Sequence, residues 1–436
     1  MTEAFSPLAL AFVQEAAEPF SPLGIRIEFI FFALTLLGVA LFHHHTLKVA
    51  LTGLVVITGY KLLFTTYDIS GHFLGAHGEE GEWRLILNLL GLLVGFSLLA
   101  KQFEDSQLPE LLPRWLPNDW KGGFVLLGLV FVLSAFLDNI AAAIIGGTVA
   151  KVVFKNKLHI GYLAALVAAS NAGGSGSVVG DTTTTMIWLA GVSPWDVTHA
   201  YAGAAAAFLF FAVIAARQQD RFQPIEKDPH GKVKVDGMRL VVVGLILAGA
   251  ILTNVIKVDG VQLGFPALGV WAAILLCAPL RAPAWHEIAP ATKGAVFLLS
   301  LVWCASLMPV EELPGASWQT VLGLGFVSAV FDNIPLTKLA IEQGGYDWGF
   351  LAYGVGFGGS MIWFGSSAGV AICNNFPQGK SVFQWVKCGW HIPVGYVIGF
   401  FAMFYLMGWQ PHEPHKEGTS LPAAPAGIEA PVSPGH

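Results

Sequence analysis

The sequence has little charge and very few cysteines for its length. Of its 436 residues, 12% are charged and four are cysteine, whereas 55% are hydrophobic. Soluble proteins carry roughly 25% charged residues, so a large soluble domain is excluded. The cysteines stand singly, without a CxxC pair, which leaves a zinc site or a disulfide framework without support. The net charge of −6 provides no basic surface, so nucleic acid is not expected as a partner.

Signatures of enzymes are missing as well. The chain contains no HExxH, GxxxxGK[ST] or CxxCH motif, and no paired histidines on facing spans that would hold a haem. The three consecutive histidines at 43–45 cannot share one helix face, so they do not predict a metal site. We therefore expect neither an enzyme nor a bound cofactor.

Long hydrophobic runs dominate the chain instead. Most of them approach the ~20 residues that a helix needs to cross a ~30 Å hydrocarbon layer. Two pairs of shorter runs are broken by charge, at Asp138 and at Asp332, and predict re-entrant hairpins, while the other runs predict ten crossings. The runs lie at 27–42, 46–66, 83–100, 121–137, 139–154, 160–191, 197–216, 239–256, 264–280, 293–308, 318–331, 334–343, 349–373 and 389–408.

The distribution of basic residues predicts the orientation. If 217–238 is cytoplasmic, alternation of the crossings places 17 Lys and Arg residues inside and four outside. This bias agrees with the positive-inside rule. The outer loops at 77–83 and 311–315 are acidic. Because the alternation would break without the two hairpins, the charge bias supports the hairpins too.

One sequence pattern occurs twice. Residues 134–143 read SAFLDNIAAA and residues 328–337 read SAVFDNIPLT, an offset of 194. A glycine-rich stretch follows each copy, NAGGSGSVVGDTTTTMIW from residue 171 and GFGGSMIWFGSSAGV from residue 356, and Gly173 and Gly358 are offset by 185. Five crossings per copy is an odd number, so the second copy enters the membrane upside down.

The predicted fold is therefore an all-α membrane protein, an inverted repeat of five transmembrane helices plus a re-entrant hairpin each, with broken helices at the midplane. The predicted divisions are an N-terminal arm (1–26), a first inverted repeat (27–216), a cytoplasmic linker (217–238), a second inverted repeat (239–408) and a disordered tail (409–436). Inverted repeats with interrupted helices are typical of secondary transporters. Alternatively, the glycines serve only tight helix packing.

Two aspartates are the strongest candidates for a site. A carboxylate within an apolar segment costs ~2.5–3.5 kcal/mol on insertion scales and indicates function. Asp138 and Asp332 lie at matching hairpin tips, which we expect to face one central cavity. Asp181 either caps the helix that it precedes or acts as a third acidic ligand. Carboxylates favour a cation as the transported solute, and desolvation favours their protonated form, so protons and cations compete for them.

Other polar side chains in these segments are further candidates. Lys338 either pairs with a carboxylate as a counter-ion or extends to the outer surface, and Lys61 is expected to extend to the surface. The candidate amide and hydroxyl ligands are Asn139, Asn171, Asn333, Ser175, Ser177, Thr182, Ser360, Ser366 and Ser367.

At these motifs the chain resembles NhaD-type sodium/proton antiporters of the ion transporter superfamily, which also contains citrate, dicarboxylate and arsenite carriers. The resemblance covers about residues 27–408. It implies a transport domain of hairpins and broken helices beside a scaffold domain that often dimerises, so we expect a homodimer in the lipid bilayer. It also implies cation ligands, with sodium at Asp138 and Asp332. The implied set is Asp138, Asn139, Asn171, Asp181, Thr182, Asp332, Asn333 and Ser360.

The sequence thus predicts a multi-pass protein of the bacterial cytoplasmic membrane that exchanges sodium or lithium ions for protons by alternating access. The alternative is a carboxylate carrier, for citrate or dicarboxylates, or an arsenite carrier of the same superfamily. The acidic hairpin tips favour the antiporter.

Overall fold

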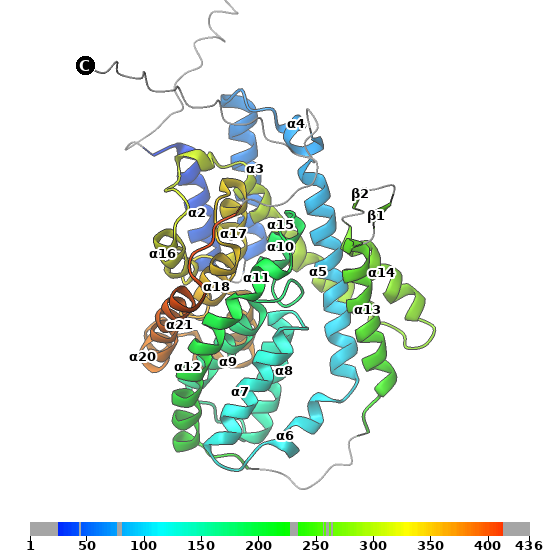
Figure 1. Ribbon diagram of the computed structural model, residues 1–436, viewed down its shortest axis with the longest axis vertical. Coiled ribbons are helices and arrows are strands. Elements are labelled where there is room, and N and C mark those ends of the chain that lie inside the picture. The colour runs from blue at the N-terminus through cyan, green and yellow to red at the C-terminus, as the bar shows by residue number, and fades with distance from the viewer. Residues whose placement is uncertain are drawn as a thin grey trace, which may run out of the picture.

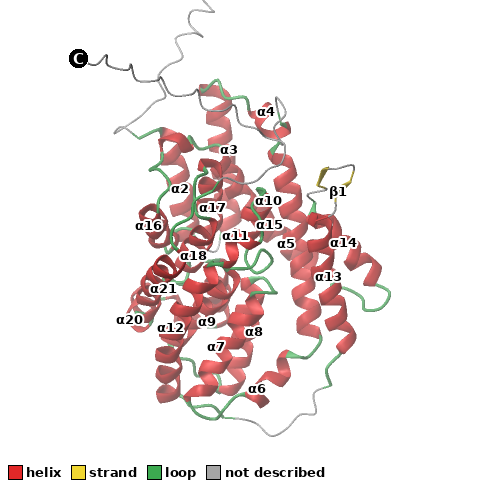
Figure 2. Ribbon diagram, in the orientation of Figure 1, coloured by secondary structure: helices red, strands yellow, loops and turns green. Residues whose placement is uncertain are grey.

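The computed structural model describes residues 25–42, 45–75, 81–226, 234–255, 257–258, 261–262 and 265–412, and within them the chain is almost entirely helical (Figures 1 and 2). The strands of this part are β1 (Lys257–Val258) and β2 (Val261–Gln262), one short antiparallel pair. Each apolar run of the sequence contains a helix. The all-α class is therefore confirmed.

The helices of the first half range from four to 24 residues in length. They are α2 (Ile27–Leu41), α3 (Thr46–Phe64), α4 (Ile69–Leu74), α5 (Glu82–Asp105), α6 (Leu112–Trp115), α7 (Trp120–Ser134), α8 (Asn139–Val153), α9 (Ile160–Gly174), α10 (Thr182–Leu189), α11 (Trp195–Thr198) and α12 (Ala200–Phe222).

The helices of the second half are of intermediate length, between 7 and 19 residues. They are α13 (Gly237–Val255), α14 (Pro266–Cys277), α15 (Ile288–Ser306), α16 (Trp318–Ser328), α17 (Asn333–Gln343), α18 (Trp348–Gly358), α19 (Ser367–Asn375), α20 (Val382–Cys388) and α21 (His391–Met407).

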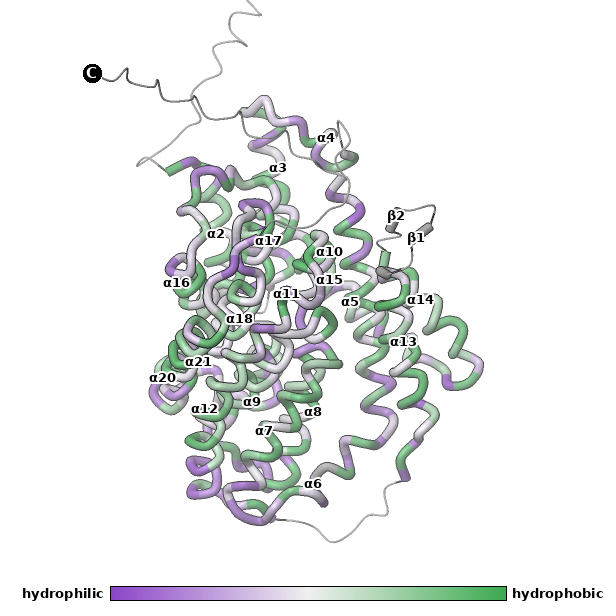
Figure 3. Tube along the Cα trace, viewed as in Figure 1, coloured by the Kyte–Doolittle hydropathy of each residue, from purple (hydrophilic) through white to green (hydrophobic). Residues whose placement is uncertain are grey.

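The helices have the length and composition of a multi-pass membrane protein. Among the described residues, four helical stretches are long and apolar enough to cross a membrane, and a fifth is added if α20 and α21, which are bent by 58°, form one span. Shorter apolar helices such as α7, α8 and α9 accompany them. Figure 3 shows hydrophobic residues along the helices and hydrophilic ones at ends such as the C-terminal end of α12. The ten predicted crossings are thus not all single long helices.

The buried side chains form one large core and smaller ones beside it. The large core joins α7–α12 with α16–α21. A second core joins α5, α13 and α14, and a third joins α2, α3 and α15. Each group of three therefore takes members from both halves of the chain: α5 packs with α13 and α14, and α15 packs with α2 and α3. Figure 1 shows α5, α13 and α14 together on one side of the molecule.

The repeated sequence pattern has matching contacts in the structure. The Ser134 hydroxyl donates to the Ser170 carbonyl at 2.5 Å, and the Ser328 hydroxyl donates to the Val355 carbonyl at 2.7 Å. These partners are related by the same offsets, 194 and 185, as the two sequence motifs. Both bonds join a hairpin arm to the following broken helix, α7 to α9 and α16 to α18. In the two halves of the chain, α7 thus contacts α9 in the same way as α16 contacts α18.

The glycines of the broken helices permit this close approach. A Cβ atom on Gly173 would clash with the Phe131 carbonyl, and a Cβ atom on Gly358 would clash with the Gly325 carbonyl. The two glycines, Gly173 and Gly358, are again 185 residues apart, and the two carbonyl residues, Phe131 and Gly325, are 194 apart. Backbone-to-backbone contact of this kind leaves room only for glycine, so these glycines serve packing as well as the helix breaks.

Two expectations about the ends of elements are wrong. Lys61 does not extend to the surface, because its side chain is buried and its ammonium lies 3.4 Å from the Glu28 carboxylate. The predicted disordered tail does not begin at 409, because the Trp409 ring packs against Phe350 and the Gln410 amide donates to Asp347. Residues 413–436, the arm up to 24, His43 and His44, and 227–233 of the linker lie outside the described residues.

Candidate functional site

The two hairpin tips have the same local structure. Asp138 precedes α8 and accepts a hydrogen bond from the Ile140 amide at 3.2 Å, and Asp332 precedes α17 and accepts one from the Ile334 amide at 3.0 Å. Their backbone angles agree within a few degrees, φ −50° and ψ 141° against φ −55° and ψ 141°. Both aspartates therefore cap a helix that begins inside the protein, and the cap uses only the Oδ1 atom of each carboxylate.

The chain between α9 and α10 is unwound, and threonines satisfy its carbonyl groups. The Thr184 hydroxyl donates to the carbonyls of Ser177 and Asp181, and the Thr185 hydroxyl donates to those of Val178 and Asp181. Non-helical backbone in a membrane requires such internal partners. The run of four threonines therefore stabilises the break and leaves the side chain of Asp181 free for other contacts.

A buried polar network joins four segments at the centre of the molecule. The Asn139 amide group donates to Asp181 Oδ1 at 2.8 Å and to Asn171 Oδ1 at 3.1 Å. The Asn171 amide group in turn donates to the hydroxyls of Ser360 at 2.9 Å and Ser366 at 3.1 Å. All five side chains are buried. The network connects the start of α8, the end of α9, the residue before α10 and the segment between α18 and α19, so it reaches from the first half of the chain to the second.

Asp181 carries the acidic group of this network. It is 2% exposed, and its second oxygen, Oδ2, is buried with no hydrogen bond of normal geometry to the described residues. The hydroxyl and the backbone amide of Thr183 lie close enough to interact with this carboxylate, although the hydroxyl is buried and has no hydrogen bond of normal geometry to any described residue. A Cβ atom on Gly356 would lie 3.2 Å from Oδ2, so the absence of a side chain there leaves space beside the oxygen. A buried carboxylate in this setting must bind either a proton or a cation.

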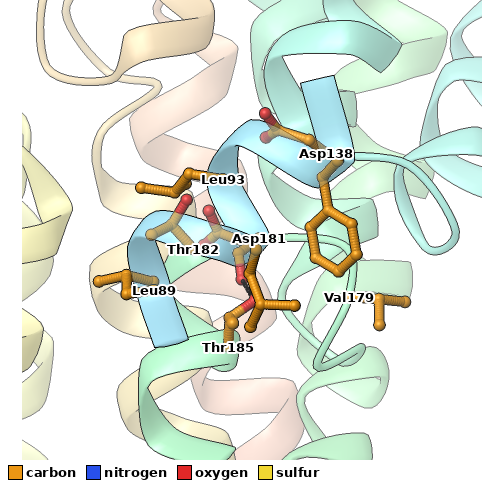
Figure 4. A pocket seen from close by; sticks show the side chains of 9 residues that line it. Leu89, Leu93, Asp138, Val179, Asp181, Thr182 and Thr185 are labelled. Atoms are coloured by element: carbon orange, nitrogen blue, oxygen red, sulfur yellow. Dashed lines mark hydrogen bonds between the residues drawn. The ribbon is translucent and has the colours of Figure 1, made fainter. Parts of the chain in front are cut away.

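The first cavity is small and lies beside this carboxylate. Its volume is about 10 Å³, and Figure 4 shows Asp138 and Asp181 on its wall with Thr182 and Thr185. Leu89, Leu92, Leu93 and Phe96 of α5 and Val179 complete the lining. A cavity of this volume accommodates about one water molecule. It is therefore large enough for one desolvated ion and too small for an organic substrate.

The second cavity is larger and lies at the other hairpin tip. Its volume is about 220 Å³, and Asp332 and Ser367 lie on its wall. The Ser367 hydroxyl donates to Asp332 Oδ2 at 3.4 Å. The rest of the lining extends toward the junction of α2 with α3 and toward the end of α19, namely Leu36, Val39, Thr46, Phe297, Val330, Phe364, Val370, Ala371 and Asn374.

The two tip aspartates thus line different cavities, and not the single central one expected from the sequence. Asp181 connects them, because Asp138 and Asp332 both act on its carboxylate electrostatically. Within the described part of the chain no group of three His, Cys, Asp or Glu side chains is placed to hold a metal ion. Sodium at Asp138 and Asp332 stays a prediction, and any such site uses amide, hydroxyl or carbonyl oxygens as well.

The other predicted ligands are distributed unevenly. Ser175 donates to the Ala172 carbonyl, and the Ser177 oxygen accepts from the Val179 amide, so both stabilise the unwound segment. Thr182 faces the first cavity. Asn333 is buried, and no hydrogen bond among the described residues connects its side chain to the network. The two halves are therefore unequal: the residue matching Asp181 in the second half is Ser366.

Lys338 lies in an ion cluster and not at the surface. It is 2% exposed, its Nζ lies 2.8 Å from Glu82 Oε1, and it also pairs with Glu342. Lys338 therefore pairs with carboxylates, neither of which is Asp138 or Asp332, and its role as a counter-ion stays a prediction. Sequence reasoning missed Glu82 because its partner is 256 residues away. It missed Thr183 because the threonine run gave no reason to separate this residue from Thr182.

Comparisons with known proteins point to membrane carriers. A protein-family model described as "Citrate transporter" matches residues 25–353. "Sodium/proton antiporter 1" of Arabidopsis thaliana is 28% identical over 326 residues, 66% of this chain and 54% of that protein. "Na(+)/H(+) antiporter NhaD" of Alkalimonas amylolytica is 25% identical over 375 residues, 73% of this chain and 77% of that protein. The protein of the same name from Vibrio cholerae is 26% identical over 367 residues, 71% of this chain and 76% of that protein. The chain therefore spans about half the length of the plant relative.

Proposed function

The chain belongs to the citrate transporter family, and from this membership and the geometry of the site we propose that it exchanges sodium or lithium ions for protons across a membrane. The relatives named as sodium/proton antiporters support this choice within the family. The bacterial relatives also support a place in a bacterial cytoplasmic membrane.

The observation that carries the proposal is the buried carboxylate of Asp181. It lies beside a cavity of about 10 Å³, its Oδ1 accepts from Asn139, and among the described residues its Oδ2 has no hydrogen bond of normal geometry. Oxygen atoms of carboxylate, amide and hydroxyl groups are the ligands that hard cations prefer. The same carboxylate is neutral when it carries a proton. One group therefore provides two mutually exclusive states, one with a proton and one with a cation.

The exchange follows from this competition. On one side of the membrane, a sodium ion binds the carboxylates of Asp181 and Asp138 and displaces a proton. After the change of conformation, a proton from the other side binds and displaces the sodium ion. Because a bare carboxylate is unfavourable in this dry interior, the empty and unprotonated site is the least stable state, and the carrier changes conformation with either ligand bound. This condition couples the two fluxes.

The conformational change is provided by an inverted repeat, which is part of the proposal. The matched hydrogen bonds of Ser134 and Ser328 support two equivalent halves. The large core of hairpins and broken helices forms the transport domain, and α2, α3, α5, α13, α14 and α15 form the scaffold. In the proposed assembly, the scaffolds of two copies join to form a homodimer. Movement of the transport domain against the scaffold exposes the site to each side in turn.

The second candidate is a carrier of citrate, dicarboxylates or arsenite, which the description of the family favours. A carboxylate substrate requires hydrogen-bond donors and helix N-termini without nearby negative charge. Here Asp138 and Asp332 occupy the helix N-termini at both tips, and they would repel an anion. A cation is therefore the better ligand for this site.

The test is an exchange assay in everted membrane vesicles of a bacterium without its own antiporters. A preformed proton gradient is monitored by dye fluorescence while sodium, lithium or potassium is added. We expect sodium and lithium to dissipate the gradient. Uptake of labelled citrate, succinate or arsenite without sodium is measured in parallel. Uptake of one of these anions together with an unchanged proton gradient would contradict the proposal.

A further inference from the structure

The ion cluster around Lys338 lies outside the proposed ion site and joins the proposed transport domain to the proposed scaffold, which are called the two bodies below. Lys338 belongs to α17, which starts at the Asp332 tip, whereas Glu82 is the first residue of α5 in the scaffold. The ammonium lies 2.8 Å from Glu82 Oε1 and is 2% exposed, so the contact is shielded from water. The second oxygen of Glu82 is buried and has no hydrogen bond to the residues that the structure describes. The buried ion pair stabilises the arrangement of α17 and α5 in which it forms, because separating the two groups leaves each charge without its partner.

The Lys338–Glu82 pair and the cavity of about 220 Å³ lie on opposite sides of Asp332. Six residues of helix separate Asp332 from Lys338, a rise of ~9 Å along α17. The cavity of about 220 Å³ extends the other way, toward Thr46 and Asn374. In the topology predicted from the basic residues, those two lie at the cytoplasmic side and Glu82 lies at the outer side. Asp332 thus faces an open space toward the cytoplasm and a closed, ion-paired segment toward the outside.

We propose that the Lys338–Glu82 ion pair is the outer gate of the protein: it closes the outer route to Asp332 and must break in each transport cycle. This inference rests on the proposed alternating-access function but not on the identity of the transported ion. Glu342 lies on α17 itself and stays with Lys338 when α17 moves. It therefore holds the ammonium in the open state, while Glu82 becomes exposed to outer water.

The chain contains a matched control for this gate. Lys61 is also buried and also pairs with a buried glutamate, Glu28, at 3.4 Å. Both residues of that pair lie in the scaffold, on α3 and α2, so the pair need not break when the transport domain moves. Substitution of Lys61 therefore reproduces the loss of a buried charge without the loss of a contact between the two bodies.

The experiment measures access to the cavity from each side. Val370→Cys places a thiol on the cavity wall in a chain whose four cysteines (Cys277, Cys304, Cys373 and Cys388) are replaced by serine. A membrane-impermeant maleimide is added to right-side-out or everted vesicles. With the gate intact we expect labelling only in everted vesicles. Lys338→Met leaves Glu82 and Glu342 facing each other without a cation, and their repulsion should raise labelling from the outside at least tenfold. Lys61→Met should leave it unchanged.

A second variant covers the case in which Lys338→Met fails to reach the membrane. Glu82→Gln keeps the shape of the contact and removes its charge, so outer labelling should rise by a smaller factor. The proposal would be overturned if labelling from the outside were the same with Lys338→Met or Glu82→Gln as in the protein with an intact gate. It would also be overturned if Lys61→Met raised outer labelling as much as Lys338→Met does. Labelling of the unsubstituted protein from the outside alone would also overturn it. The assay uses no sodium or proton gradient, so failure of the antiport proposal would not affect its outcome.

Discussion

Replacement of Asp181 by asparagine is expected to abolish exchange while the protein still folds. Asparagine has the same shape, and its oxygen can still accept the bond that Asn139 donates. Its amide neither releases a proton nor neutralises a cation, so both ligand states of the site are lost. We expect at least a ~100-fold loss of sodium-dependent proton movement in everted vesicles, which corresponds to ~2.8 kcal/mol at ~1.4 kcal/mol per tenfold.

Asp119→Asn is the control for this substitution. Asp119 precedes α7 and accepts from the Lys121 amide, but it is exposed and lies outside the network. Its replacement should leave exchange within about twofold. If Asp181→Asn retains normal exchange at a normal expression level, the assignment of the site is wrong.

The second large effect is expected at the hairpin tips, where both Asp138→Asn and Asp332→Asn should abolish exchange. Substitution by glutamate, which keeps the carboxylate and lengthens the side chain by one methylene, should affect the two positions differently. Asp332 lies beside about 220 Å³ of space, which accommodates one more methylene, whereas the cavity at Asp138 has about 10 Å³. Asp332→Glu should therefore retain exchange within about tenfold of the unsubstituted protein, and Asp138→Glu should lose it.

This comparison has its own internal control. Both substitutions remove an aspartate cap from a helix in the same backbone conformation, so the loss of the cap affects both variants alike. Equal activity of the two glutamate variants would show that the cavities do not define the space around these carboxylates. Normal exchange in both asparagine variants would show that Asp138 and Asp332 are not part of the ion site.

The sequence predicted the features that depend on local pattern. The aspartates that interrupt the apolar runs, Asp138 and Asp332, stand directly before α8 and α17. Aspartate is a preferred residue at this position because its carboxylate accepts a hydrogen bond from a free amide of the first helical turn. The paired offsets of 194 and 185 also recur in the hydrogen bonds of Ser134 and Ser328. A repeated sequence repeats its local contacts, so these features required no knowledge of the tertiary structure.

The contacts between distant segments could not be predicted in this way. Two roles for Asp181, cap or ligand, were equally compatible with its position before α10. The structure shows that its side chain makes no cap hydrogen bond and accepts from Asn139 instead, and the ligand role stays a prediction. Lys61 and Lys338 are both paired and buried because a glutamate from another helix reaches each of them. Hydropathy alone predicts that a lysine near a membrane surface extends into water, and the partner carboxylates change that outcome.

The separation of the two tip aspartates has a similar cause. Their symmetric sequence positions suggested one shared cavity, but symmetry in a repeat also allows two equivalent cavities on opposite sides of a centre. The residue that makes the halves unequal is Asp181, whose counterpart is Ser366. Its carboxylate is coupled electrostatically to both tips, so the acidic centre of the site lies in the first half.

Equilibrium binding of radioactive sodium to the purified protein tests the central claim most directly. If protons and sodium compete for the carboxylate of Asp181, the apparent affinity for sodium should fall about tenfold for each unit by which the pH is lowered while the site titrates, since one proton must leave for each ion bound. Asp181→Asn should show no saturable binding. Saturable sodium binding that is independent of pH and unchanged in Asp181→Asn would contradict the account.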